Sequence, residues 1–212
     1  MTTDQLITLL VADLKPVDRR RILRAVIVAL VIGIAAAFGV MLLIFGIRPE
    51  IPGARNPDFL VIKLLFAFAV VMTGAKFLPR MARPGTETRF PALIFMPFAA
   101  IAAAAVVVLG SAHFSTWTGM ILGKDWLTCL LSIPLLAALP FAALIWALSI
   151  GAPTDRTRAG EIAGLVAGGL AALACAFPCA DGPLPSIALW YALPITICAR
   201  FGARLGPSLL RW

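Results

Sequence analysis

The sequence predicts an all-α, polytopic membrane protein, and three observations support this fold class. Of the 212 residues, 61% are hydrophobic and only 13% are charged. A soluble domain is about 45–50% apolar and about 25% charged, so much of this apolar surface is expected to face lipid. The apolar runs are long and unbroken, whereas strands of a membrane β-barrel alternate apolar and polar residues. Crossings of about 20 residues each also leave no room for a separate extramembrane domain of ordinary size.

Six apolar stretches are expected to form transmembrane helices. The first, 25–46, follows a polar segment, 1–24, that ends in a basic run. It is too long for the apolar region of a signal peptide, which predicts an uncleaved helix. The five later stretches are 59–77, 91–110, 126–150, 161–177 and 187–205. Pro134, Pro140 and Pro194 lie inside these stretches, where proline kinks a helix.

Positive charge is divided unevenly between the two sets of predicted loops. Fourteen Lys and Arg residues lie at the two chain ends or in and beside the 78–90 and 151–160 loops. The opposite loops hold three, which are Arg48, Arg55 and Lys124. Lys and Arg collect on the cytoplasmic side of membrane proteins, so both termini are predicted to be cytoplasmic. Topology therefore explains the net charge of +8 better than nucleic-acid binding does.

This topology brings several chemically active side chains to the outer face. Cys129 lies near the start of the fourth stretch and Cys175 near the end of the fifth. Cys179 is expected to start the loop that follows the fifth stretch, and His113 and Asp181 lie in outer loops. Thiols there can form disulfides, oxidise or bind soft metals, and the bacterial periplasm is oxidising. A single cysteine is more often a small buried apolar residue, and a lone histidine is usually solvated. For Cys129 with Cys179 we favour a function, because topology brings both to one face.

Three other features have simpler structural interpretations. Gly160, Gly164 and Gly168 recur every four residues, a spacing that lets two membrane helices approach closely. Lys63 lies a few residues inside the second stretch, and its side chain is expected to extend to the outer interface. Cys198 falls in the inner half of the sixth stretch, away from the outer group.

Residues 3–14 are predicted to form a short amphipathic helix in the N-terminal segment. Its apolar stripe contains Leu6, Ile7, Leu10 and Leu14, and Asp4 could cap its start. One interpretation is that this helix lies on the membrane surface. The other is that it docks into a groove on a soluble partner.

A set of short motifs follows one order along the whole chain. They are Asp4-Gln5-Leu6-Ile7, Leu10, Asp13-Leu14, Pro16-Val17, Gly46-Ile47-Arg48-Pro49-Glu50, Arg83-Pro84-Gly85, Cys179-Ala180-Asp181, Trp190-Tyr191 and Leu209-Leu210-Arg211-Trp212. In this order and spacing they resemble the NrsF-type anti-sigma-F factors. The resemblance implies a six-helix protein of the bacterial inner membrane that holds an extracytoplasmic-function sigma factor inactive. It also implies release of that sigma factor on periplasmic redox or heavy-metal stress.

The resemblance also suggests roles for individual residues. It maps the sensory cysteines onto Cys129 and Cys179 and gives no such role to Cys175 or Cys198. Cys175, His113 and Asp181 are auxiliary candidates only because the predicted topology places them at the same face. The resemblance divides the chain into a cytoplasmic sigma-binding segment, 1–24, and a six-helix transmembrane domain, 25–212. The expected sigma-binding residues are Asp4, Leu6, Ile7, Leu10, Asp13 and Leu14.

The expected partners are the sigma factor and the lipid bilayer, without direct contact to nucleic acid. No enzymatic activity and no resident cofactor are expected, although Cys129 and Cys179 could form a disulfide or bind a soft metal. The sequence lacks the His-x-x-x-Cys-x-x-Cys motif of soluble zinc-binding anti-sigma factors.

Two other function classes fit the sequence less well. A membrane thiol-disulfide oxidoreductase would be expected to contain a Cys-x-x-Cys pair, which this sequence lacks. A small transporter would be expected to show broken helices lined by charge, or paired repeats. The prolines of the fourth stretch are the one hint of such helices.

Overall fold

The computed structural model describes residues 19–46, 57–82, 92–122, 126–151, 153–178 and 182–210, and all regular structure in these ranges is helical. The helices are α2 (Arg19–Phe45), α3 (Pro57–Met81), α4 (Met96–Ser111), α5 (Trp117–Leu122), α6 (Trp126–Ser149), α7 (Arg156–Cys175) and α8 (Leu184–Leu209). Two 3₁₀ turns, η1 (Ala92–Ile94) and η2 (Phe114–Thr116), precede α4 and α5. The all-α prediction is confirmed.

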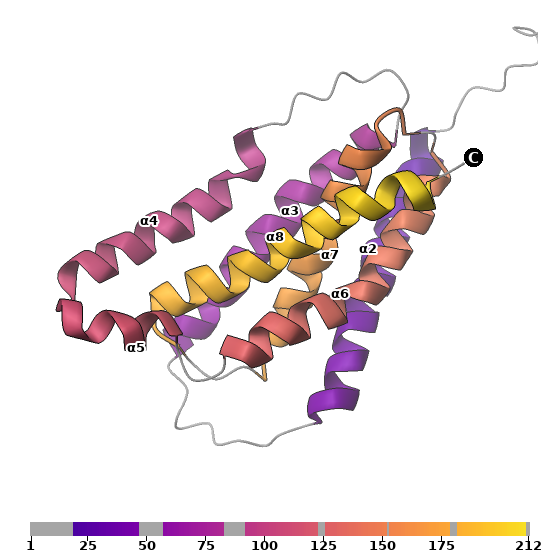
Figure 1. Ribbon diagram of the computed structural model, residues 1–212. Helices are drawn as coiled ribbons and strands as arrows, with labels where there is room; N and C mark the ends of the chain where they lie inside the picture. Colours follow the sequence, from indigo (N-terminus) through magenta and orange to yellow (C-terminus); the bar gives the residue numbers. More distant parts are fainter. Residues whose placement is uncertain are drawn as a thin grey trace, which may run out of the picture.

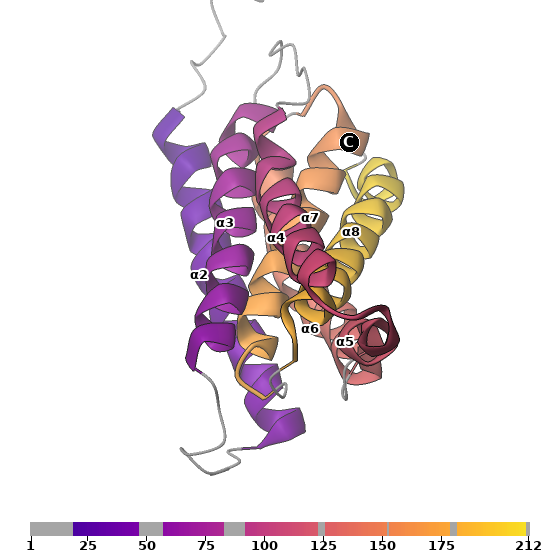
Figure 2. The ribbon, with the colours of Figure 1, turned by 90° about the vertical axis from the view of Figure 1, so that its left-hand side faces the viewer.

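Helix α7 occupies the centre of the bundle. It contacts α2, α3, α6 and α8, and the long helices run side by side around it (Figure 1, Figure 2). Helix α4 lies on the outside, against α8 and α3, and the short α5 crosses the direction of the long helices at one end. Because α7 touches four helices, a displacement of this helix would disturb most of the bundle.

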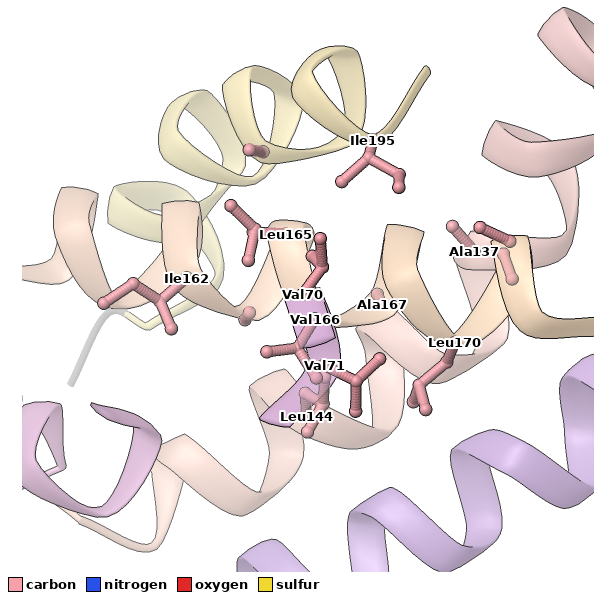
Figure 3. Close-up of a cluster of buried hydrophobic side chains, with 14 of the residues drawn as sticks. Val70, Val71, Ala137, Leu144, Ile162, Leu165, Val166, Ala167, Leu170 and Ile195 are labelled. Carbon is pink, nitrogen blue, oxygen red and sulfur yellow. The ribbon is translucent and has the colours of Figure 1, made fainter. Parts of the chain in front are cut away.

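The composition of α7 explains its central position. Fifteen of its 20 residues are buried, and most of them are Gly or Ala, which allow neighbouring backbones to come close. Its larger side chains, Ile162, Leu165, Val166 and Leu170, fill a cluster with side chains from the surrounding helices (Figure 3). The partners labelled in that view are Val70 and Val71 from α3, Ala137 and Leu144 from α6, and Ile195 from α8.

The outer surface of the bundle is strongly apolar. Large hydrophobic side chains project outward on every long helix except α7; Leu43, for example, is 86% exposed. Burying such side chains away from water stabilises each by roughly 1.5–3 kcal/mol, so this surface is compatible with a membrane protein.

Five helical segments of the described chain are long and apolar enough to cross a membrane. They are Arg20–Ile44, Asp58–Met81, Phe114–Ser149, Arg156–Cys175 and Leu184–Leu209. Helix α4 is apolar but has only 16 residues, or about 24 Å at 1.5 Å per residue, against a hydrocarbon core of about 30 Å. The count of six spans therefore remains a prediction that depends on α4.

Several helices extend beyond the apolar stretches that predicted them. Helix α7 begins at Arg156 rather than near residue 161, and α2 begins at Arg19, within the basic run. Helix α8 extends from Leu184 to Leu209, and α6 and α8 continue through their internal prolines. Hydropathy marks the part of a helix that suits lipid, whereas the hydrogen-bonded helix continues into polar residues.

Candidate functional site: the cysteine end of the bundle

Two buried thiols lie at the end of the bundle where α6 begins and α7 ends, which we call the cysteine end. Cys129 lies in the first turn of α6 and is 7% exposed, and Cys175 is the last residue of α7 and is fully buried. His113 lies at the same end, exposed, at the start of η2. The start of α6, the end of α7 and the connection between α4 and α5 lie at one end of the bundle, and these segments carry the three residues (Figure 1).

Some of the predicted site residues lie outside the described residues. These are the outer-loop candidates Cys179 and Asp181, and the predicted sigma-binding residues Asp4, Leu6, Ile7, Leu10, Asp13 and Leu14. Within the ranges that the structure describes, no group of three or more His, Cys, Asp or Glu side chains could hold a metal ion. The pairing of Cys129 with Cys179 and the auxiliary roles of Cys175, His113 and Asp181 therefore remain predictions.

An aromatic framework joins three elements at the cysteine end. Trp190 of α8 packs against Trp126 of α6, with ring centroids 5.0 Å apart and ring planes tilted by 38°. The indole Nε1 of Trp190 also donates a hydrogen bond of 2.8 Å to the carbonyl oxygen of Ile121 in α5. Since Cys129 follows Trp126 by three residues, the contact between the two indoles lies at the helical turn that carries this cysteine.

Lys63 of α3 does not extend to the surface, contrary to the prediction. Its side chain is only 2% exposed, and its Nζ lies 5.9 Å from the ring centroid of Tyr191, which is equally buried. A cation over an aromatic face is attracted by the ring quadrupole, and the attraction strengthens when both groups are removed from water. Sequence reasoning missed this contact because its two partners are on helices far apart in the chain.

The three spaced glycines of α7 lie directly against α8. A methyl group added at Gly160 would overlap the carbonyl oxygen of Gly202, and one at Gly164 would overlap the carbonyl oxygen of Cys198. At Gly168 the added carbon would lie 3.1 Å from Cβ of Cys198. We call this interface the glycine seam; it consists of Gly160, Gly164 and Gly168 on α7 and Cys198, Gly202 and Gly206 on α8.

The α8 half of the glycine seam was not recognised in the sequence. Cys198, Gly202 and Gly206 have the same four-residue spacing as the α7 glycines, so they form one stripe on α8. The helices are antiparallel, which places Gly206 near Gly160 and Cys198 near Gly168. Cys198 therefore has a packing position in the glycine seam, separate from the cysteine end.

The opposite end of the bundle is basic, and we call it the arginine end. Exposed Lys or Arg side chains lie at the start of α2 and in the C-terminal halves of α3 and α8, namely Arg20, Arg21, Arg24, Lys76, Arg80, Arg200 and Arg204. Helix α7 also begins here. Asp155 caps it by accepting a 3.0 Å hydrogen bond from the backbone N–H of Arg158, and the two side chains form a 3.0 Å ion pair.

The described chain is thus an all-helical bundle with an apolar surface, buried thiols at one end and basic residues at the other. This architecture defines a class of helical-bundle proteins compatible with membrane insertion, with no metal-binding cluster among the residues that the structure describes. The sequence profile of a family described as "Negative regulator of sigma F" matches residues 10–212. The chain therefore belongs to the NrsF family, and the resemblance seen in its motifs is confirmed.

Two relatives extend over the full length of the chain. A protein of Azospira oryzae named "Probable anti-sigma-F factor NrsF" is 31% identical over 213 residues, covering all of both chains. A Caulobacter vibrioides protein named "Anti-sigma-F factor NrsF" is 31% identical over 221 residues, again covering all of both. No solved structure matches the chain.

Proposed function

We propose that this chain is a membrane-bound anti-sigma factor that sequesters a sigma-F-like, extracytoplasmic-function sigma factor and releases it on periplasmic stress. The observation that carries this proposal is the family match over nearly the whole chain, joined by two full-length relatives that are named anti-sigma-F factors. A regulatory role of this kind needs a partner-binding segment and a part that changes conformation. It requires no enzymatic activity.

The proposed location is the bacterial inner membrane, with the arginine end in the cytoplasm. Five long apolar helices and an outward-facing apolar surface support insertion. The exposed basic side chains gather at the end of the bundle where α2 begins and α8 ends, and basic residues favour the cytoplasmic side. Both termini are then cytoplasmic, and the cysteine end faces the periplasm.

The proposed stimulus is an oxidant or a soft metal that reaches the cysteine end. Cys129 and Cys175 are at this end, and their thiols are the chemistry that such stimuli modify. Cys179 follows the end of α7 by four residues in the sequence, which supports pairing it with Cys129. The sensory pair in this proposal is therefore Cys129 with Cys179.

The sigma factor is expected to bind the N-terminal segment through its apolar stripe. Membranes containing the tagged chain should capture an extracytoplasmic-function sigma factor, identified by mass spectrometry of the purified complex. Replacing Leu6 and Leu10 with Asp should abolish capture, because burial of each Leu contributes about 1.5–3 kcal/mol. The matched control is Leu43→Asn, a change on the exposed face of α2, which should insert and still capture.

Unchanged capture by the Leu6→Asp, Leu10→Asp chain would contradict the binding role of this segment. Failure of the wild-type chain to capture any sigma factor would contradict the proposed function itself.

A further inference from the structure

The neighbouring residues Trp190 and Tyr191 of α8 contact three other helices. Trp190 packs against Trp126 of α6 and donates its indole hydrogen bond to the Ile121 carbonyl of α5. Tyr191, adjacent in sequence, turns its ring toward the ammonium group of Lys63 on α3. Successive residues on a helix point about 100° apart, so the pair can reach elements on different sides of α8.

The contacts of this pair are polar or directional, unlike most of the surrounding packing. An indole N–H that is removed from water needs a hydrogen-bond acceptor. The hydrogen bond to a carbonyl oxygen forms only at one placement of the two helices relative to each other. A buried ammonium over an aromatic face is likewise sensitive to small displacements. These contacts therefore specify the positions of α3, α5 and α6 relative to α8 more narrowly than apolar packing would.

Two further connections extend from the pair. Cys129 follows Trp126 by three residues on α6, so the two side chains lie on nearby parts of one helix face. In the other direction, α8 continues from Tyr191 into the glycine seam, where its backbone is held against α7 as far as Gly206. A continuous, close-packed route thus connects the turn carrying Cys129 to the arginine end.

We propose that Trp190 and Tyr191 are positioning residues, which hold the turn of α6 that carries Cys129 against α8. Through this contact, α8 becomes the helix that transmits a change at the cysteine end to the arginine end. The signalling part of this inference rests on the proposed function, whereas the positioning part does not.

The positioning part is tested by the chemical reactivity of Cys129 in the full-length chain. Cys175, Cys179 and Cys198 are replaced by Ser, the protein is reconstituted in lipid nanodiscs, and the rate of labelling by a membrane-permeant maleimide is measured. Trp190→Ala should increase the Cys129 rate about tenfold or more, since a hydrogen bond and an aromatic contact are lost together. Trp190→Phe keeps the ring and should give a smaller increase.

The Tyr191 contact is tested in the same assay by a double-mutant cycle. Tyr191→Leu and Lys63→Met should each increase Cys129 labelling, and the double variant should increase it no further, because each change removes the same contact. Tyr191→Phe keeps the ring and should leave the rate near that of the wild type. Fully additive effects would overturn the role of this pair.

Two controls separate positioning from general loosening. Trp146→Ala removes an exposed indole from the same helix as Cys129 and should leave its labelling unchanged. A chain that retains only Cys198 reports on the glycine seam, and Trp190→Ala should change its labelling by less than about twofold, because the seam's own contacts remain. Equal increases at Cys129 and Cys198, or no increase at Cys129, would overturn the positioning role.

The signalling part uses stress-induced release of the captured sigma factor from membranes. Trp190→Ala should leave capture without stress unchanged and should shift the oxidant concentration needed for release by about tenfold, with Trp190→Phe closer to the wild type. An unaltered release curve in a chain whose Cys129 labelling has changed would overturn α8 as the carrier. A wild-type chain that captures no sigma factor would refute the proposed function and leave the labelling result standing.

Discussion

At the scale of single residues, the glycine seam shows how a missing side chain determines the position of two helices. Gly164 of α7 lies so close to α8 that the carbonyl oxygen of Cys198 occupies the space that a methyl group at Gly164 would need. Backbone atoms cannot rotate away as a long side chain can, so a larger residue must separate the helices. Close approach also increases dispersion contacts along the whole interface, which are the main source of helix association in lipid.

Gly164→Val should therefore destabilise the protein by about 1–3 kcal/mol through overpacking. Thermal unfolding in detergent, followed by circular dichroism, would measure the loss. Gly39→Ala is the matched control, since no atom lies within 4 Å of the added carbon. That change should be neutral or stabilising by up to about 1 kcal/mol, because alanine has the higher helix propensity. Equal stability of the two variants would show that the glycine seam does not hold α7 on α8.

At the scale of helices, the start of α7 depends on a cap rather than on hydrophobicity. The first residues of α7, Arg156 to Gly160, are polar or small and lie outside the apolar stretch. Asp155 makes a helix possible there, because its carboxylate accepts a hydrogen bond from an N–H group that has no partner within the helix.

Asp155→Ala should reduce the stability of the protein by about 1 kcal/mol, within the usual range of about 0.5–2 for a lost N-cap. Asp155→Asn keeps a capping oxygen and should remain close to the wild type. The partly exposed ion pair with Arg158 is expected to contribute little, as is usual for exposed pairs. Detergent unfolding of the two variants would separate the cap from the ion pair, and equal losses would assign the stabilisation to the ion pair instead.

The sequence predicted the helices of the bundle better than their contacts. Long apolar runs identify helices such as α2 and α6, because their outward-facing side chains are hydrophobic along the whole helix. The short helix α5 was missed, since its six residues lie in a predicted loop and carry no long periodic pattern. Lys63 was misplaced because its surroundings depend on Tyr191, which belongs to another helix and approaches only when the bundle is assembled.

At the scale of the whole molecule, orientation in the membrane determines what each end of the bundle can sense or bind. The arginine end contains the exposed basic residues of α2, α3 and α8, while the cysteine end contains two thiols and the indoles of Trp126 and Trp190. Tryptophan is enriched at membrane interfaces, where its ring is apolar and its N–H is polar. This distribution agrees with a bundle whose two ends meet different aqueous compartments.

Reporter fusions would determine this orientation directly. A fusion at His113, which is exposed at the cysteine end, should be active only with a periplasmic reporter. A fusion after Trp212 should be active only with a cytoplasmic reporter. Reporters on the same side would contradict the three crossings expected between His113 and the C-terminal end, through α6, α7 and α8, and would remove the cysteines from the proposed sensory face.

Signalling between the two ends requires energy of a size that thiol chemistry can supply. A disulfide changes stability by about 2–4 kcal/mol, and coupling between distant sites usually amounts to about 1–3 kcal/mol. The conformational change at the cysteine end must also reach the arginine end. The close packing of α7 and α8 along the glycine seam provides a continuous series of contacts between the two ends.

Cys129→Ser and Cys179→Ser should therefore each abolish release of the sigma factor by oxidants and by soft metals, while leaving its capture intact. Serine has almost the same size but cannot form a disulfide, and it is a poor ligand for soft metals. Cys198→Ser is the control, because that residue lies in the glycine seam and should leave the response unchanged. Release would be measured as sigma-dependent transcription in cells exposed to each stress. A response that survives in both variants would exclude the two cysteines as the sensor, and the stimulus would then have to act elsewhere on the chain.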